Sequence, residues 1–151
     1  MSLYAIALFA HIVGAVLVFV LLTIEGLGLR FGFPYARLNQ VFGPISAALI
    51  LVPGLYMMAT QWGWTGWIVT GITAWVLIAV LGAYTGIGVA RGTLSAGTVT
   101  VTWLARVGLA LGVVFDMTIK PSLSIAVAAA LVGLVIGAGL GLGIRREVRT
   151  T

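Results

Sequence analysis

The stretch Trp103–Leu123, WLARVGLALGVVFDMTIKPSL, decides how the rest of the chain must be arranged. It is apolar enough to enter a lipid bilayer, yet it contains Arg106 and Asp116 and nearly ends on Lys120. A charged side chain at the centre of a bilayer costs about 3 kcal/mol or more, so it persists only where it is paired, faces the interior of a bundle or has a function. We therefore expect other helices of the chain to surround these groups.

The composition of the 151-residue chain is that of a membrane protein. Hydrophobic residues make up 62% of it and charged residues only 7%, and its mean hydropathy is +1.23, outside the range of soluble globular domains. The net charge of +5 comes from basic residues at the ends of apolar runs, so the expected partner is the lipid bilayer and not nucleic acid. The absence of cysteine excludes disulfides and Cys-ligated metals, and the single histidine excludes a multi-histidine site within one chain.

Five apolar segments are long enough to span the hydrocarbon core, which takes roughly 20 residues of helix. The sequence predicts an all-α, polytopic transmembrane bundle that forms a single domain over residues 1–151. Its helices are expected at about residues 3–29, 41–60, 67–90, 99–119 and 122–144. The first segment lacks the basic start of a signal peptide and is expected to remain as a helix. A four-helix bundle is the alternative, in which the last two segments form a re-entrant pair at Lys120 and Pro121.

Basic residues predict the orientation of this bundle. If the C-terminal tail is cytoplasmic, only Lys120 falls on the outer side among the residues that flank the helices. The cytoplasmic side then holds Arg30, Arg37, Arg91, Arg145, Arg146 and Arg149. We therefore predict a multi-pass protein of the bacterial inner membrane with its N-terminus outside and its C-terminus inside.

Glycine and proline residues predict where the helices touch and bend. Gly133, Gly137 and Gly141 form two consecutive G-xxx-G steps, which let helix backbones approach closely. Such a face serves packing within the bundle, a homo-oligomer or a larger membrane complex. Pro44 is expected in the first turn of the second helix, whereas Pro53 lies in its middle and should kink it.

Two pairs of ionisable residues share one spacing. His11 and Glu25 are 14 residues apart on the first expected helix, and Arg106 and Lys120 are 14 residues apart on the fourth. This spacing leaves each pair about 40° apart around the helix and about 21 Å apart in height. Because the two helices would run in opposite directions, setting Glu25 level with Arg106 also sets His11 level with Lys120. We therefore predict neighbouring helices with an inner, structural ion pair of Glu25 and Arg106. An outer polar cluster would consist of His11, Asp116 and Lys120.

The outer cluster is compatible with three kinds of chemistry. His11 and Asp116 are suited to a proton relay. A His/Met pair can serve as the axial ligands of haem, and methionine thioethers bind Cu(I). The candidate cofactor-binding residues are therefore His11, Met58, Met117 and Lys120. The alternative is structural: a histidine held by a hydrogen bond at a helix contact, and methionines that fill space.

Three segments of the chain carry a resemblance. They are ALFAHIVGAVLVFV (7–20), VFGPISAALILVPGLYMM (41–58) and LARVGLALGVVFDMTIKPSL (104–123). Their order resembles a family of small bacterial integral membrane proteins of unknown function, and more distantly the copper-resistance-D-type membrane domains and the HemJ-type protoporphyrinogen oxidases. Those families have a histidine early in their first helix, and the HemJ type also relies on a later lysine. The resemblance thus points to His11 and Lys120.

These features lead to one functional expectation and two alternatives. We expect an integral membrane protein without catalysis of its own that binds a partner, or a small hydrophobic ligand or cofactor, in the outer half of the bundle. The first alternative is a haem-binding redox protein or HemJ-like oxidase that uses His11. The second is a proton-coupled or copper transporter built around His11 and Asp116.

Overall fold

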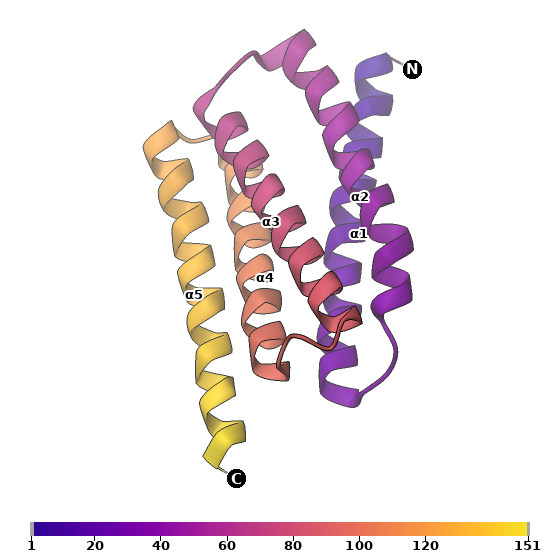
Figure 1. Cartoon of the computed structure of the whole chain (residues 1–151). Helices are drawn as coiled ribbons and strands as arrows, with labels where there is room; N and C mark the ends of the chain where they lie inside the picture. The colour runs from indigo at the N-terminus through magenta and orange to yellow at the C-terminus, as the bar shows by residue number, and fades with distance from the viewer. Residues whose placement is uncertain (1, 151) are drawn as a thin grey trace. The chain divides into compact units, whose positions relative to one another are not determined.

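The structure, a computed structural model, describes residues 2–150 and the side chains of residues 2–144. This part of the chain is helical and contains no strand. Its elements are α1 (Leu3–Phe31), α2 (Ala36–Met57), η1 (Met58–Trp62), α3 (Gly66–Ala90), α4 (Ala96–Ile119) and α5 (Leu123–Thr150) (Figure 1). The segment η1 is a π-helix that continues α2. The prediction of an all-α chain is confirmed.

Five helices of the described chain are long and apolar enough to cross a membrane. They are α1, α2 together with η1, α3, α4 and the part Leu123–Ile144 of α5. The prediction of five spans is thereby confirmed over the four-helix alternative, because α4 and α5 are each long enough to cross separately. The chain has the helices of a multi-pass membrane protein.

The start of α2 differs from the expected start at residue 41. The helix begins at Ala36, because the polar segment ARLNQ (36–40) consists largely of good helix formers and continues the helix beyond its apolar part. Pro44 therefore lies inside the helix, and the prediction that it occupies the first turn is wrong. Hydropathy identifies only the apolar part of this helix, and the helix begins five residues before that part.

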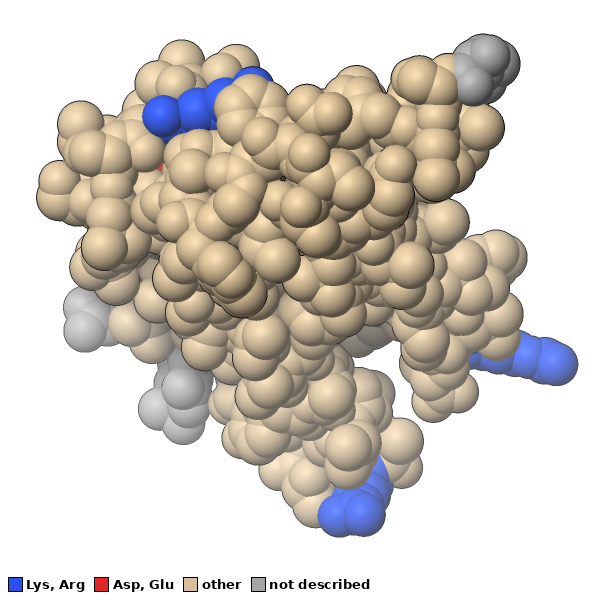
Figure 2. Space-filling view, turned by 90° about the horizontal axis from the view of Figure 1, so that it is seen from above, with Lys and Arg blue, Asp and Glu red and all other residues tan. Residues whose placement is uncertain are grey.

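The two acidic residues among the described side chains are buried. Figure 2 shows one face of the molecule, on which uncharged residues predominate, Lys and Arg atoms form small separate groups, and Asp and Glu atoms are almost hidden. Glu25 has an exposed fraction of 2% and Asp116 of 0%. The side chains of Arg145, Arg146 and Arg149, on which the predicted orientation partly rests, lie outside the described residues.

The helices form two compact units, Met1–Thr65 and Gly66–Thr151. In the first unit α1 packs on α2 at Gly14. A Cβ atom on Gly14 would lie 2.9 Å from the backbone nitrogen of Ile50 and equally close to Leu49. The buried hydroxyl of Ser46 donates a hydrogen bond of 2.9 Å to the Gly14 carbonyl. The two backbones thus touch where glycine leaves room.

In the second unit α4 and α5 lie side by side (Figure 1). A Cβ atom on Gly133 would run into the Gly108 carbonyl, and one on Gly137 into the Leu104 carbonyl. A Cβ atom on Gly141 would lie 2.7 Å from the Cα atom of Val101. Each step of four residues along α5 therefore matches a step of three or four residues back along α4. We call this contact the glycine seam.

The helix α3 completes the second unit. Ala74 of α3, Leu109 of α4 and Ala130 of α5 form its buried apolar core. A hydrogen bond of 2.9 Å between the hydroxyl groups of Thr85 and Thr102 joins α3 to α4. Small core residues and a side-chain hydrogen bond between spans are the usual means by which membrane helices associate.

Candidate functional site

His11 lies on α1 and is held by the backbone of α2. Its Nδ1 atom donates a hydrogen bond of 2.8 Å to the carbonyl oxygen of Ile50. The imidazole packs on Gly54, where an added Cβ atom would lie 3.2 Å from both the Cε1 and Nδ1 atoms of the ring. Glycine at position 54 therefore makes the space into which the ring fits.

Pro53 lies in the same part of α2 as the carbonyl that accepts the His11 bond. Proline has no amide hydrogen, so the carbonyl of Leu49, four residues earlier, loses its usual partner in the helix. His11 donates to the carbonyl of Ile50, the next residue along the helix. The proline, the glycine and the histidine thus form one arrangement.

The hydrogen bond also determines which ring nitrogen is available. A carbonyl can only accept, so Nδ1 carries the proton, and in a neutral imidazole Nε2 is left with a lone pair. Histidines that bind metals are commonly oriented in this manner, with the second nitrogen donating to a carbonyl or a carboxylate. The geometry of His11 therefore suits a ligand-binding imidazole.

An open apolar groove of about 540 Å³ runs along the same helix pair. Its lining includes Ala7 and Ala10 from α1 and Leu49, Pro53 and Tyr56 from α2. Ala10 and Leu49 are the chain neighbours of His11 and Ile50. The volume falls in the range of sites that hold small ligands, and Tyr56 supplies a hydroxyl group among otherwise hydrocarbon walls.

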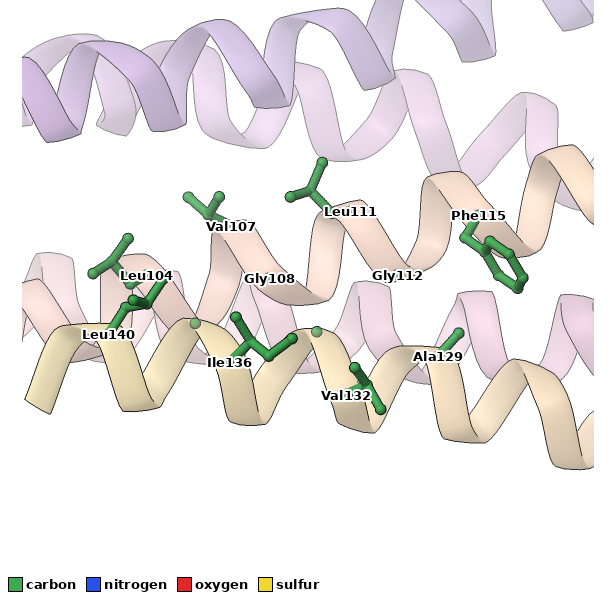
Figure 3. Close-up of a pocket in the computed structure, with 12 residues that line it drawn as sticks. Leu104, Val107, Gly108, Leu111, Gly112, Phe115, Ala129, Val132, Ile136 and Leu140 are labelled. Atoms are coloured by element: carbon green, nitrogen blue, oxygen red, sulfur yellow. The ribbon is translucent and has the colours of Figure 1, made fainter.

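A second groove, of about 360 Å³, lies along the glycine seam of α4 and α5 (Figure 3). Side chains such as Val107, Leu111, Ile136 and Leu140 form its walls, and the glycines form its floor. Every lining residue is apolar. With no hydrogen-bonding side chain to orient a ligand, this groove offers a surface for hydrocarbon chains and little means of selecting one.

The predicted cofactor residues are divided between the two units. Met58 belongs to the same unit as His11 and follows Gly54 by four residues, so it shares the helix face on which the imidazole packs. Met117 and Lys120 belong to the second unit. Met117 fills the space over Gly71, since a Cβ atom there would lie 2.6 Å from the methionine Cε atom. This contact gives Met117 a packing role.

Asp116 is completely buried in the second unit, with an exposed fraction of 0%. Neither of its carboxylate oxygens has a hydrogen-bond partner among the residues whose side chains are described. Lys120 caps α4 with a left-handed backbone (φ 53°), and its ammonium group lies 6.0 Å from the centre of the Trp67 ring. Because the helix ends at Lys120, before Pro121, the regular i,i+4 arrangement that would favour a bond to Asp116 is lost.

Glu25 and Arg106 belong to different units, and each has polar neighbours within its own. Glu25 accepts a hydrogen bond of 3.0 Å from the side-chain amide of Asn39. Arg106, with an exposed fraction of 6%, donates from Nε to the Thr102 carbonyl at 3.3 Å. The proposed ion pair between Glu25 and Arg106 stays a prediction.

Asn39 was missed from the sequence, although the chain contains a signal for it. The loop between α1 and α2 has only four residues, 32–35, so the helices must fold back on each other. A residue on α1 and a residue on α2 that are separated from the loop by similar numbers of residues then lie at the same height, within about one helical turn. Asn39 and Glu25 meet this condition, and the polar character of Asn39 next to a buried acid could have identified the contact.

The described side chains include no group of three or more His, Cys, Asp or Glu residues that could hold a metal ion. Comparisons of the chain with protein-family models, with curated proteins and with solved structures find no match.

Proposed function

We propose that the protein is a bacterial inner-membrane protein that binds a small, mostly hydrophobic ligand or cofactor through His11, in the outer half of the α1–α2 pair. The observation that carries this proposal is the hydrogen bond from Nδ1 to the Ile50 carbonyl, which leaves Nε2 for a ligand. The apolar groove on the same helix pair supports it, because this groove can hold a hydrocarbon body; it is lined by Ala10, the chain neighbour of His11, and not by His11 itself.

Two substitutions separate ligand binding by His11 from its structural role. In His11→Asn the side-chain amide lies close to the place of Nδ1 and can still donate to Ile50, but no atom replaces Nε2. We expect this variant to keep the thermal stability of the wild type and to bind the ligand at least about ten times more weakly, as expected when one good polar contact of about 1.4 kcal/mol is removed, so that less ligand remains bound. His11→Ala loses both functions of the ring and should also melt at a lower temperature.

Ligand occupancy can be measured without knowing the ligand. The protein is purified in mild detergent, bound small molecules are extracted, and their masses are compared between the wild type and the variants. Thr23→Ala, an exposed position on the same helix, serves as the matched control and should keep full occupancy. Equal amounts of every bound compound in the wild type and in His11→Asn would refute the proposal.

A haem is the second candidate for this site, and the observation that favours it is the position of Met58. Met58 follows Gly54, on which the imidazole packs, by one helical turn, and its backbone N–H bonds to the Gly54 carbonyl. An imidazole and a thioether form a well-known axial pair, and the bound haem would supply one-electron chemistry. A visible spectrum of the purified protein should then show haem absorption that changes in Met58→Ala; a spectrum without haem absorption after expression with added haemin excludes this candidate.

We further propose that the N-terminus is outside and the C-terminus is cytoplasmic, because Arg30, Arg37 and Arg91 then lie on the cytoplasmic side. A fluorescent protein fused after Thr151 should fluoresce, and alkaline phosphatase fused before Leu3, behind an export signal, should be active. Control fusions after Arg91 and after Trp64 should report the cytoplasm and the outside. Two ends on the same side would contradict this orientation.

A further inference from the structure

Asp116 is the only aspartate of the chain. It lies in the last turn of α4, inside a segment that can span a membrane. Its exposed fraction is 0%, and neither carboxylate oxygen has a hydrogen-bond partner among the described residues. Buried polar groups nearly always have such a partner, so an acid without one requires an explanation.

The glycine seam shows what lies opposite Asp116 on α5. Gly108 packs on Gly133, and Gly112 packs on Ala129 and Ala130. Because four residues along α4 correspond to three or four residues back along α5, the next step brings Asp116 close to the level of Ala126. That alanine also has an exposed fraction of 0%. The acid therefore lies where two helices are in close contact and a ligand of ordinary size has no room.

Few ionisable groups face this position within the unit. The part Leu123–Ile144 of α5 has none, and the ionisable residue of α3 is Tyr84, near the opposite end of that helix. On α4 itself they are Arg106, ten residues earlier, and Lys120, whose ammonium lies over the Trp67 ring. The described residues also form no His, Cys, Asp or Glu group for a metal ion.

These surroundings disfavour an ionised carboxylate. An anion in a buried, apolar contact has lost its hydration and, without hydrogen-bond donors, has gained nothing in return. A neutral carboxylic acid loses far less on burial. The occupant that fits both the lack of space and the lack of donors is a proton.

We propose that Asp116 is a proton-binding site within the membrane-spanning region and that it carries a proton as a neutral carboxylic acid in this conformation. This inference is independent of the ligand site proposed at His11. When the end of α4 opens to water, the O–H bond breaks, the electron pair stays on the carboxylate and the proton passes to water. The nearest basic residue in the sequence is then Lys120, four residues along the chain, whose positive charge favours the anion. Proton release is thereby linked to a movement at the α4–α5 connection.

Infrared spectroscopy of the wild-type protein tests this directly. Aspartate with a carbon-13 carboxyl group, incorporated by cell-free synthesis, labels Asp116 alone, since the chain has no other aspartate. In lipid vesicles at neutral pH we expect a carboxylic acid C=O band that shifts with the label and is absent from Asp116→Asn. A label-sensitive carboxylate band without the acid band would overturn the proposal.

Chemical modification provides a second measurement. Dicyclohexylcarbodiimide reacts with protonated carboxyl groups in apolar surroundings, and a single adduct on Asp116 is expected by mass spectrometry. Asp116→Asn should lose this adduct. Glu25→Gln is the matched control, because it removes the other buried acid, and it should keep the adduct. Replacing potassium by sodium in the buffer should leave the rate of carbodiimide modification unchanged. A slower modification of Asp116 in sodium would show that a metal cation occupies the site and would also overturn the proposal.

Discussion

Replacing Gly137 by leucine should cause one of the two largest losses of stability that a single substitution can produce in this protein. A side chain at this position points into the backbone of α4, where an added Cβ atom would already meet the Leu104 carbonyl. Backbone atoms cannot move aside as the end of a flexible side chain can. The helices must separate. We expect the free energy of unfolding to fall by about 3 kcal/mol or more, which is at the upper end of the cost of overpacking.

Gly139 provides the matched control for this experiment. It lies two residues further along the same helix, and an added Cβ atom there would meet nothing within 4 Å. Gly139→Leu should therefore melt near the wild-type temperature, or slightly above it because leucine favours the helix over glycine. Thermal unfolding in mild detergent measures both variants. Equal melting temperatures for the two leucine variants would place residue 137 away from α4.

Leucine at Gly14 should have a comparable effect in the first unit. An added Cβ atom there would lie 2.9 Å from atoms of both Leu49 and Ile50, and the Gly14 carbonyl also accepts the Ser46 hydrogen bond. Moving the helices apart breaks that bond, which contributes about 0.6 kcal/mol in membrane proteins. We expect a total loss of about 3 kcal/mol, of which overpacking is the larger part.

The Gly14→Leu experiment also has a functional readout. His11 lies one turn before Gly14 and needs the Ile50 carbonyl within hydrogen-bond distance. Separation of α1 from α2 should therefore abolish ligand binding even at temperatures where the protein remains helical. Gly86→Leu, which fills an open position on α3, is the control for adding leucine to a membrane helix. Full ligand occupancy in Gly14→Leu would show that the site does not depend on this helix contact.

The helices of this protein could be predicted from the sequence because the bilayer imposes a length and an apolar composition on each of them. The start of α2 could not, since the helix runs on through ARLNQ and nothing in hydropathy registers that extension. The π-helix η1 was missed for a related reason: it differs from an α-helix in its hydrogen bonds and not in its composition.

For the candidate site, the sequence identified the side chains but not their backbone partners. His11 was recognised as an unusual residue, whereas its bond to Ile50 was not foreseen because every residue offers the same carbonyl. Pro53 and Gly54 were the usable signals. In the second unit, the four-residue spacing of Asp116 and Lys120 would favour a bond within a regular helix, but the left-handed backbone at Lys120 removes that geometry.

The glycine seam makes part of the α4–α5 contact electrostatic in character. At a glycine, the position that a Cβ atom would take is occupied by a Cα hydrogen. The Gly108 carbonyl lies in this direction from Gly133, the Gly133 carbonyl from Gly108, and the Leu104 carbonyl from Gly137. These are Cα–H···O contacts, worth about 0.5–1 kcal/mol each, and hydrocarbon provides no water to compete for them. Two apolar helices are thus held together partly by the attraction between their peptide dipoles and the polarised hydrogens of glycine.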